Sequence, residues 1–382
     1  VESGCIWDRM VYRMTEWIEC TLDKLGEIVG GATPSTKCED YYGGSIPWIT
    51  PKDLSSFKGR YITSGERNIT EKGLASCSAQ MMPKDAVLFT SRAPIGYVAI
   101  ASQSVCTNQG FKSIVVNEKA DPLFVYYLLK YNKDAIEAMG SGTTFKEVSG
   151  KTMRAVKVRI PLDVSYQKRI AAVLDSLDTK IENNERINDN LQQQAQAIYS
   201  SMFIDNPDPA WSHGHLSDLI TVKYGKDHKK LADGIYPVYG SGGIMRYVER
   251  PLYNKESVLI PRKGTLNNVM YVNQPFWSVD TMFYTEMKLP NVAKFVYHFV
   301  KAKDLASMNA GSAVPSMTTD ILNAMEVVIP SASALEEFES LVAPMYEAME
   351  ANDVQSKALS QIRDTLLPKL MSGEIDVSDV QL

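Results

Sequence analysis

Apolar residues recur at alternating steps of four and three along the segment from Ser165 to Phe203. This spacing is typical of a helix that packs along its whole length against one partner helix. The recurring positions are Ile170, Leu174, Leu177, Ile181, Asn184, Asn188, Leu191, Ala195, Ile198 and Met202. The pattern predicts a long helix over residues 163–203. Two ordinary amphipathic core helices are the alternative, although a glycine-free seam of 39 residues is long for them.

A related pattern returns 168 residues later, which predicts a second long helix over residues 331–372. Its positions are Phe338, Val342, Met345, Met349, Asn352, Ser356, Leu359, Arg363, Leu366 and Leu370. The partner helix therefore lies in the same chain. Asn184 and Asn352 stand at the two midpoints, so they meet if the helices are antiparallel. A buried asparagine pair fixes the register of a coiled coil at some cost in stability.

Two prolines disturb the second helix, because a proline in a helix interior costs about 3 kcal/mol. We expect a kink or a new start near Pro344 and a frayed last turn after Pro368. Ser333 and Glu336 have the spacing of a capping box, and Gly373 is a plausible stop.

The chain is a tandem repeat of a globular module followed by a long helix. Trp17, Leu22 and Leu25 open the first half with the spacing that Trp211, Leu216 and Leu219 repeat in the second. Other matches are Val87-Leu88 with Val258-Leu259, Phe124–Leu128 with Phe295–Phe299, and Ile160-Pro161 with Ile329-Pro330. The expected segments are an N-terminal extension (1–13), module 1 (14–162), helix 1 (163–203), a proline-containing linker (204–210), module 2 (211–330), helix 2 (331–372) and a C-terminal tail (373–382).

Each module mixes short strand patterns with helices. The expected strands of module 1 are Ser45–Thr50, Ala86–Thr90, Gly96–Ala101, Lys112–Asn117 and Ala155–Ile160, bounded by glycine, proline and serine. Helices are expected over Pro122–Met139 and Ala293–Met308. The predicted fold class is α+β: two globular modules joined by two long antiparallel helices that form an intramolecular coiled coil with pseudo-twofold symmetry.

Composition sets only broad limits. Of the 382 residues, 45% are hydrophobic and 22% charged, as in ordinary globular proteins. No apolar run approaches the ~18–20 residues of a membrane span, and no secretory signal is evident. The five cysteines lack C-x-x-C spacing, so reduced thiols and a cytoplasmic location are expected rather than disulfides or zinc.

The net charge of −5 is unevenly distributed. Residues 17–160 hold 18 Lys and Arg against 14 Asp and Glu, and residues 211–330 hold 13 against 10. The helical segments 161–210 and 331–382 are acidic, with 4 against 8 and 3 against 10. Mildly basic modules and acidic helices suit two DNA-facing modules on an arm that faces protein.

The sequence offers no catalytic or metal-binding motif. The segment Gly140–Lys146 has the wrong spacing for a phosphate-binding loop, and Asn206–Pro209 lacks the aromatic residue of an amino-methyltransferase loop. His213 and His215 are better explained as solvated loop residues than as metal ligands. We therefore predict that the chain binds and does not catalyse.

Several motifs resemble the specificity (S) subunit of type I restriction-modification systems, from about Met14 to the end. The motifs are GGATPSTKCEDYYGGSIPWITPKDL (Gly30–Leu54), DAVLFTSRAPIGYVAI (Asp85–Ile100), TNQGF (Thr107–Phe111), Ile160-Pro161, the Gln167-x-x-Ile170-Ala171-x-x-Leu174 and Asp178-x-x-Ile181 positions, and LLPKLMSGEIDV (Leu366–Val377). The second half departs from this pattern: IYPVYGSGGIMRYV (Ile235–Val248) replaces the IPWIT-type run.

The resemblance implies a non-catalytic subunit in which each module is a target recognition domain for one half of a split, asymmetric DNA sequence. The coiled coil would set the distance between the half-sites and bind two methyltransferase (M) subunits; restriction (R) subunits could complete the system. No cofactor is expected in this chain. S-adenosylmethionine would belong to the M subunits, and ATP and Mg to the R subunits.

Base-reading residues are expected among polar and basic side chains in glycine-rich loops, where the backbone can approach DNA. The candidates are Thr33, Ser35, Lys52, Arg92, Asn108, Gln109 and Lys146 in module 1, and Lys226, Lys229, Arg262, Lys263, Asn267 and Asn268 in module 2. Arg92 and Arg262 are favoured because both follow equivalent Val-Leu strands. The alternative for each is a solvated loop residue.

Two other functions stay open on the sequence: a self-contained methyltransferase or nuclease, and a coiled-coil adaptor that binds only proteins. Neither explains why the two globular halves are duplicated yet divergent.

Overall fold

A computed structural model describes residues 16–92, 94–142, 146–308 and 316–381. The chain divides into two compact units, Val1–Asn183 with Val354–Leu382 (unit 1) and Asn184–Asp353 (unit 2). Each unit therefore contains one globular module and a part of both long helices. The expected N-terminal extension, residues 1–13, lies outside the described residues.

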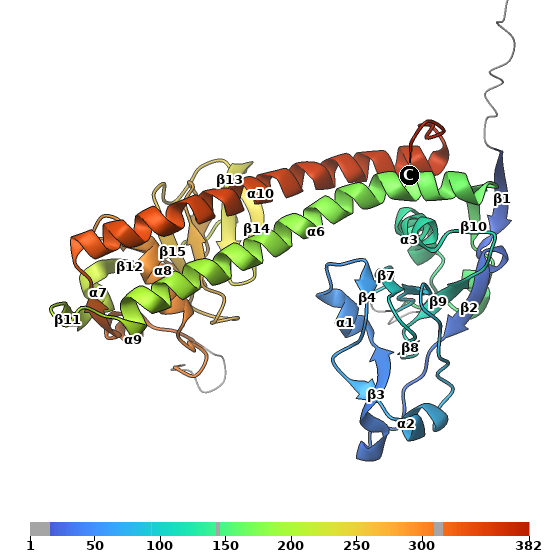
Figure 1. The fold of residues 1–382 in the computed structure, drawn as a ribbon, viewed down its shortest axis with the longest axis horizontal. Helices are drawn as coiled ribbons and strands as arrows, with labels where there is room; N and C mark the ends of the chain where they lie inside the picture. Colours follow the sequence, from blue (N-terminus) through green and yellow to red (C-terminus); the bar gives the residue numbers. More distant parts are fainter. Residues whose placement is uncertain (1–15, 93, 143–145, 309–315, 382) are drawn as a thin grey trace, which may run out of the picture. The chain divides into compact units, whose positions relative to one another are not determined.

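The two long helices are α6 (Val164–Ser200), green in Figure 1, and α10 (Ala332–Ser372), red in the same figure. A π-helical turn, Ser201–Asp205, extends α6. In unit 1, Arg363 donates to Asp178 at 2.6 Å and the Tyr166 hydroxyl donates to Asp376 at 2.8 Å. Arg363 of α10 thus lies opposite Asp178, and the segment just after α10 lies opposite Tyr166 near the start of α6, so the helices are antiparallel there.

The same direction holds in unit 2, where Tyr199 packs against Phe338 and Asn184 lies opposite Asn352. The fully buried Asn184 donates its side-chain amide to the Asn352 backbone carbonyl at 3.4 Å. Asn352 in turn donates to the side chain of Asn188 at 2.8 Å. The two central asparagines thus meet through a ladder of side-chain and backbone bonds. The division between the units falls immediately beside them.

Neither proline of α10 interrupts the helix, so the expected new start near Pro344 is wrong. Both prolines lie on the exposed face, where water can satisfy the carbonyl groups that lose their partner. The last turn continues to Ser372 and ends at Gly373, whose φ of +79° and amide bond to Leu370 close the helix. Ser331, not Ser333, accepts the N-terminal amide hydrogen bond, from Ala334 at 3.3 Å.

The module of unit 1 contains three small sheets among its described residues. The antiparallel pair is β1 (Trp17–Thr21) and β10 (Lys157–Pro161). The five-stranded sheet has the order β2 (Gly26–Gly30), β9 (Lys112–Val116), β6 (Val87–Phe89), β7 (Val98–Ala101) and β4 (Tyr61–Ile62). The third sheet has the order β5 (Asn68–Ile69), β3 (Tyr42–Ile49) and β8 (Cys106–Thr107). Its helices are α1 (Pro51–Ser55), α2 (Glu71–Ala75), α3 (Pro122–Tyr131), α4 (Lys133–Ala138) and α5 (Gly150–Arg154).

The module of unit 2 repeats this plan. Its first described sheet pairs β11 (Ser212–His215) with β19 (Glu326–Ile329). The second has the order β12 (Ile220–Tyr224), β18 (Met282–Met287), β15 (Ser257–Pro261) and β16 (Met270–Val272). The third has the order β14 (Gly243–Val248), β13 (Asp233–Gly240) and β17 (Trp277–Ser278). Its helices are α7 (Leu216–Leu219), α8 (Ala293–Lys301) and α9 (Thr319–Asn323). In both modules the third sheet has a parallel pair, β3 with β8 and β13 with β17. The tandem repeat is therefore present in the strand topology as well as in the sequence.

The helix expected over Pro122–Met139 is two helices, α3 and α4, which meet at Asn132. The Asn132 side chain donates to the Leu128 carbonyl at 2.8 Å and so competes with the continuing helix. Its counterpart α8 ends at Lys301, earlier than the expected Met308.

Equivalent residues of α3 and α8 make buried polar contacts to the long helices of their own units. In unit 1, the Tyr127 hydroxyl donates to Asp178 at 2.8 Å. In unit 2, the fully buried His298 lies 2.8 Å from Gln196 and 2.9 Å from the Tyr346 hydroxyl. These contacts fix each module to its part of the coil.

His298 makes unit 2 sensitive to acid. Burial, and secondarily the charge of Lys301, lowers the pKa of His298 from its ordinary value of 6.5 to about 4. A depressed pKa means that only the unfolded chain is protonated between these values, so stability falls as pH falls. Lowering the pH from 7 to 5 should reduce the free energy of unfolding of unit 2 by about 2 kcal/mol through this residue. Urea titrations at both pH values will measure the change, and His298→Gln should lose most of it.

Candidate nucleic-acid interface

Four segments of module 1 are joined by backbone hydrogen bonds at one end of its sheets. Ala32, after β2, donates to Thr107 at 3.0 Å. Ser91, after β6, donates to Gly110 at 2.7 Å, and Ser91 accepts from Val148 at 2.9 Å. Segments far apart in sequence therefore form one continuous loop surface. Most of the expected base-reading residues of module 1 lie on it.

Module 2 builds the same surface with the same bonds. Lys226 donates to Ser278 at 2.8 Å, Arg262 donates to Thr281 at 2.8 Å, and Arg262 accepts from Met317 at 2.9 Å. Isolated bridges join Arg92 to Glu147 in one module and Lys263 to Ser316 in the other. Each loop of module 1 thus has a counterpart in module 2.

These bonds set the residue equivalence between the modules. Ser91 corresponds to Arg262, so Arg92 corresponds to Lys263 and not to Arg262. The two arginines both follow the equivalent Val-Leu strands, as expected, but they do not stand at equivalent positions. The Val-Leu strands do correspond, but Arg92 stands five residues after Val87, whereas Arg262 stands four after Val258. Cationic side chains nevertheless occupy the equivalent positions Arg92 and Lys263.

Close backbone crossing at this surface demands glycine. A Cβ on Gly31 would lie 2.1 Å from the Thr107 carbonyl oxygen, and a Cβ on Gly225 would lie 2.0 Å from that of Val279. In each module a tryptophan side chain donates a hydrogen bond to the backbone carbonyl of the residue that follows this glycine. Trp48, on β3, donates to the Ala32 carbonyl at 3.0 Å, and Trp277, on β17, donates to the equivalent Lys226 carbonyl at 2.8 Å. The two tryptophans reach the same position from different strands.

In module 1 the structure brings Thr33, Gln109, Asn108, Arg92 and Lys146 to this surface. Thr33 and Gln109 are hydrogen-bonded to each other through their side chains. Asn108 is partly structural, because its side chain accepts from Gly110 at 2.8 Å within the turn. Ser35 and Lys146 are exposed, and Arg92 is half-buried.

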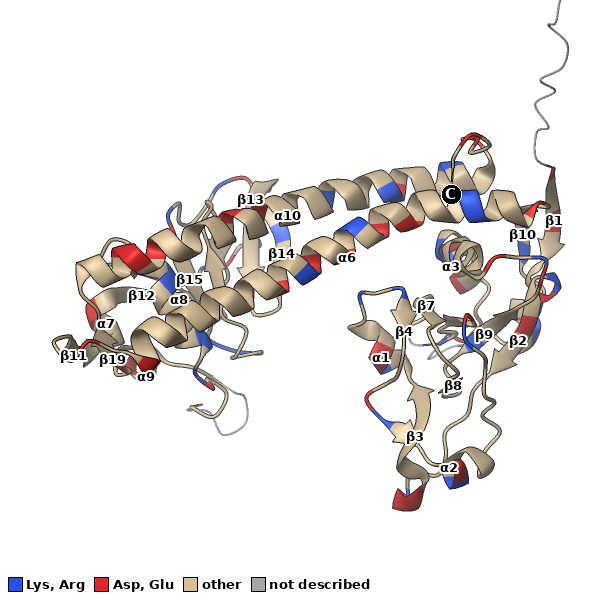
Figure 2. Cartoon of the chain, viewed as in Figure 1, with Lys and Arg blue, Asp and Glu red and all other residues tan. Residues whose placement is uncertain are grey.

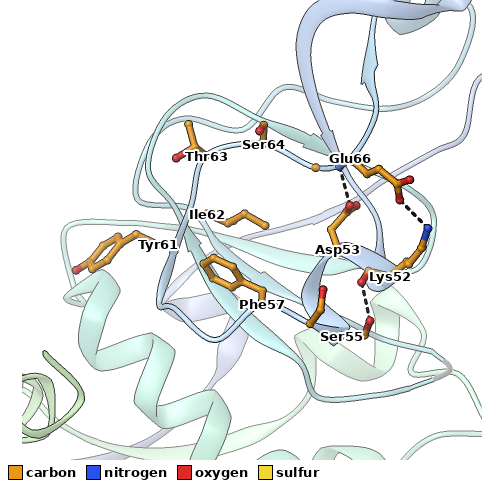
Figure 3. Close-up of a pocket in the computed structure, with 11 residues that line it drawn as sticks. Lys52, Asp53, Ser55, Phe57, Tyr61, Ile62, Thr63, Ser64 and Glu66 are labelled. Carbon is orange, nitrogen blue, oxygen red and sulfur yellow. Dashed lines mark hydrogen bonds and ion pairs between the residues drawn. The ribbon is translucent and has the colours of Figure 1, made fainter. Parts of the chain in front are cut away.

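Lys52 lies beside an open hollow of about 710 Å³, drawn in Figure 3. Its ammonium group pairs with Glu66 at 2.6 Å, and the Glu66 amide donates to Asp53 at 2.8 Å. The rings of Phe57 and Tyr61 also line the hollow. A lysine already paired with a carboxylate has less to offer a phosphate than the cations of the loop surface.

In module 2, Arg262 stacks its guanidinium over the Tyr224 ring at 5.3 Å and donates to the Asp280 carbonyl at 3.2 Å. Lys226, Lys229 and Lys263 are exposed. Asn267 donates to Asp304 at 3.0 Å and Asn268 donates to the Ser241 carbonyl at 2.8 Å, so both hold loops together. Figure 2 shows the charged residues of both modules, together with acidic and basic residues interspersed along α6.

Sequence reasoning missed Glu147 and Ser241, which both lie at this surface. The glycine cluster Tyr239–Gly243 was a signal for the second, since glycine-rich turns mark loops where the backbone is exposed. Glu147 gave no comparable signal, because its bridge to Arg92 depends on the folded chain.

Comparison with known proteins decides the family. The type I restriction modification DNA specificity domain matches residues 14–193 and again 210–338. The chain belongs to the specificity subunits of type I restriction-modification systems. It is 32% identical to the MjaIX specificity subunit of Methanocaldococcus jannaschii, over 96% of this chain and 95% of that protein. It is 23% identical to the EcoprrI specificity subunit of Escherichia coli, over 87% and 89%.

The fold agrees with a solved specificity subunit. The crystal structure of the S subunit from M. genitalium covers 95% of this chain and 98% of its own, with a TM-score of 0.62 at 19% identity. Specificity subunits are the non-catalytic components of type I systems, so this S subunit recognises DNA sequence and is not itself an enzyme. Within the described ranges, no helix is long and apolar enough to span a bilayer, and no cluster of three potential metal ligands is found.

Proposed function

We propose that this S subunit reads a bipartite, asymmetric DNA target, with one module for each half-site. The observation that carries the proposal is one loop scaffold built twice with different side chains. Ala32, Ser91 and Gln109 of module 1 are replaced by Lys226, Arg262 and Asp280 at the equivalent positions of module 2. A common scaffold with different donors and acceptors favours two readers of unlike sequences.

We further propose that the coiled coil sets the spacing between the half-sites and docks two M subunits. The length of α6 supports the first part: 37 residues span about 55 Å, or roughly 16 base pairs. Exposed apolar residues along the helices support the second part, because each lacks cover within its own unit. They are Ile187, Leu341, Val354 and Ile362.

The partners follow from the same proposal. Duplex DNA and the M subunits would bind this chain, and R subunits could join them in the cytoplasm. S-adenosylmethionine would act in the M subunits, and ATP with Mg in the R subunits. The test is to map methylated adenines in DNA from cells that express this chain with its M partner. A bipartite motif with a fixed gap is expected, and methylation without such a motif would refute the proposal.

Replacing either equivalent cation should change DNA recognition. Arg92→Ala and Lys263→Ala should each weaken binding of the reconstituted complex to its target by about 10- to 100-fold, as expected for a lost base or phosphate contact. Competition binding at fixed salt will measure the loss. Lys157→Ala, on the exposed side of β10, is the control. A protein-only adaptor would instead show unchanged methylation with all three variants.

Lengthening both helices together should widen the gap in the target. One additional heptad in each, placed beside Asn184 and Asn352, preserves the seam and adds about 10 Å. The unread gap should grow by about three base pairs while both half-sites stay the same. Methylation mapping will show the new gap. An unaltered gap would mean that the coil does not set the spacing.

A further inference from the structure

The β13–β14 hairpin of module 2 has an exposed apolar tip. Gly240 pairs with Gly243, which leaves Ser241 and Gly242 as a two-residue loop. The next two side chains, Ile244 and Met245, are 42% and 61% exposed. They lie within about 7 Å of the end of the ribbon, at ~3.3 Å per residue. Large apolar side chains in such a place are not needed for the core.

A bulge directs one of these side chains. Val238 pairs with Arg246, whereas Tyr239 pairs with Ile244, so Met245 is an extra residue in β14. Bulges re-aim a side chain and are frequent next to functional sites. The rest of the hairpin is well fixed, since Val238 and Val248 are buried in one cluster with Phe276.

The tip is attached to the loop surface described above. Asn268 donates its side-chain amide to the Ser241 carbonyl at 2.8 Å. Gly264, with a φ of +87°, lies so close that an added Cβ would be 2.7 Å from the Ser241 hydroxyl. Gly264 directly follows the cationic pair Arg262 and Lys263. The apolar tip and the cations of module 2 therefore belong to one surface.

The hairpin loop contacts the loop surface through Ser241 but is open at Gly242 and Gly243. A Cβ added to Gly242 or Gly243 would meet nothing within 4 Å. The strand residue just before the loop is held, because Val279 donates to the Tyr239 carbonyl at 3.1 Å. Figure 1 shows β13 and β14 as the two adjacent strands of this ribbon. The major groove, about 12 Å wide, admits a two-stranded β-ribbon.

We propose that the β13–β14 tip enters the major groove of the half-site read by module 2, and that Ile244 and Met245 contact the methyl group of a thymine. The inference rests on the proposed function and deepens it. Neither side chain carries a hydrogen-bond donor, so the base feature that they can distinguish in the major groove is the apolar C5-methyl group. Arg262 and Lys263 hold the neighbouring phosphates, and the tip reads the base.

Single thymine-to-deoxyuridine substitutions test the inference, because they remove only the methyl group. The reconstituted complex with its M subunit would be titrated with target duplexes substituted at one thymine at a time. At one thymine of the module 2 half-site, the substitution should weaken wild-type binding about fourfold, the effect of one buried methyl group. The double variant Ile244→Ala/Met245→Ala should bind the thymine and deoxyuridine duplexes equally. Leu289→Ala is the control, because Leu289 is an exposed leucine that follows the C-terminal end of β18. Like the wild type, this variant should bind the thymine duplex more tightly than the deoxyuridine duplex.

The outcomes separate the two proposals. If the complex selects a bipartite target but no deoxyuridine effect disappears in the double variant, the tip does not read a methyl group and the proposed function stands. A half-site without an A·T pair would overturn the inference in the same way. If the complex shows no sequence preference, the proposed function fails and this inference fails with it.

Discussion

Replacing Phe338 with alanine should lower the free energy of unfolding of unit 2 by about 4 kcal/mol. Phe338 is fully buried on α10, and its ring packs against Tyr199, Phe203 and His298 at centroid distances of 5.2 to 6.2 Å. The substitution removes these contacts and leaves a cavity that a ring-lined core cannot easily collapse to fill. The contact also joins α10 to α6 and to the module. The loss should therefore affect the whole of unit 2.

Urea unfolding followed by circular dichroism will measure this loss. Leu341→Ala is the matched control, since Leu341 lies three residues further on the same helix and is exposed. It should change stability by less than about 0.5 kcal/mol. If Phe338→Ala costs no more than this control, the seam is not the packing surface of α10.

Replacing Lys294 with alanine should destabilise unit 2 by about 3 kcal/mol. The ammonium group is almost fully buried and bonds Glu339 of α10 at 2.6 Å and Glu256 at 3.3 Å. It also lies 5.1 Å from the centre of the Tyr271 ring. The variant leaves two carboxylates side by side without a cation. This loss of stability is at the lower end of the range for removing one partner of a buried ion pair, because both carboxylates keep some contact with water.

The control for Lys294 is Lys255→Ala, an exposed lysine next to Glu256 in sequence. It should leave the unfolding midpoint nearly unchanged. Combining Lys294→Ala with Glu339→Gln removes one of the stranded charges and should recover part of the loss. If Lys294→Ala alone has the same unfolding midpoint as the wild-type protein, the buried cation does not stabilise unit 2.

The long helices could be predicted closely from sequence. Their seam positions repeat along continuous segments, and helix 1, expected over 163–203, is found as α6 (Val164–Ser200). Helix 2, expected over 331–372, is found as α10 (Ala332–Ser372). Periodicity succeeds here because each helix forms all its backbone bonds within one segment. The effect of Pro344 was misjudged, because proline preference says nothing about which face of a helix meets water.

The loop surface was predicted only in part. Glycine-rich motifs identified the loops, but the joining of Ala32 with Thr107 and of Ser91 with Gly110 depends on strand pairing across the module. For the same reason the correspondence of Arg92 with Lys263 could not be predicted from the sequence. An alignment of like residues also could not show that Trp48 and Trp277 have the same role. They stand on different strands, β3 and β17, and only the folded chain brings each indole to the equivalent backbone carbonyl.

By itself the sequence determined the family, the tandem plan and the two long helices, because these are carried by local motifs and by periodic apolar positions. The tertiary structure alone decided how Asn184 meets Asn352, which loops join into one surface, and which residue of module 1 corresponds to which residue of module 2. It also placed the apolar hairpin tip beside the cations of module 2. These features arise from contacts between residues distant in the chain, and such contacts are set by strand register and side-chain packing rather than by spacing along the sequence.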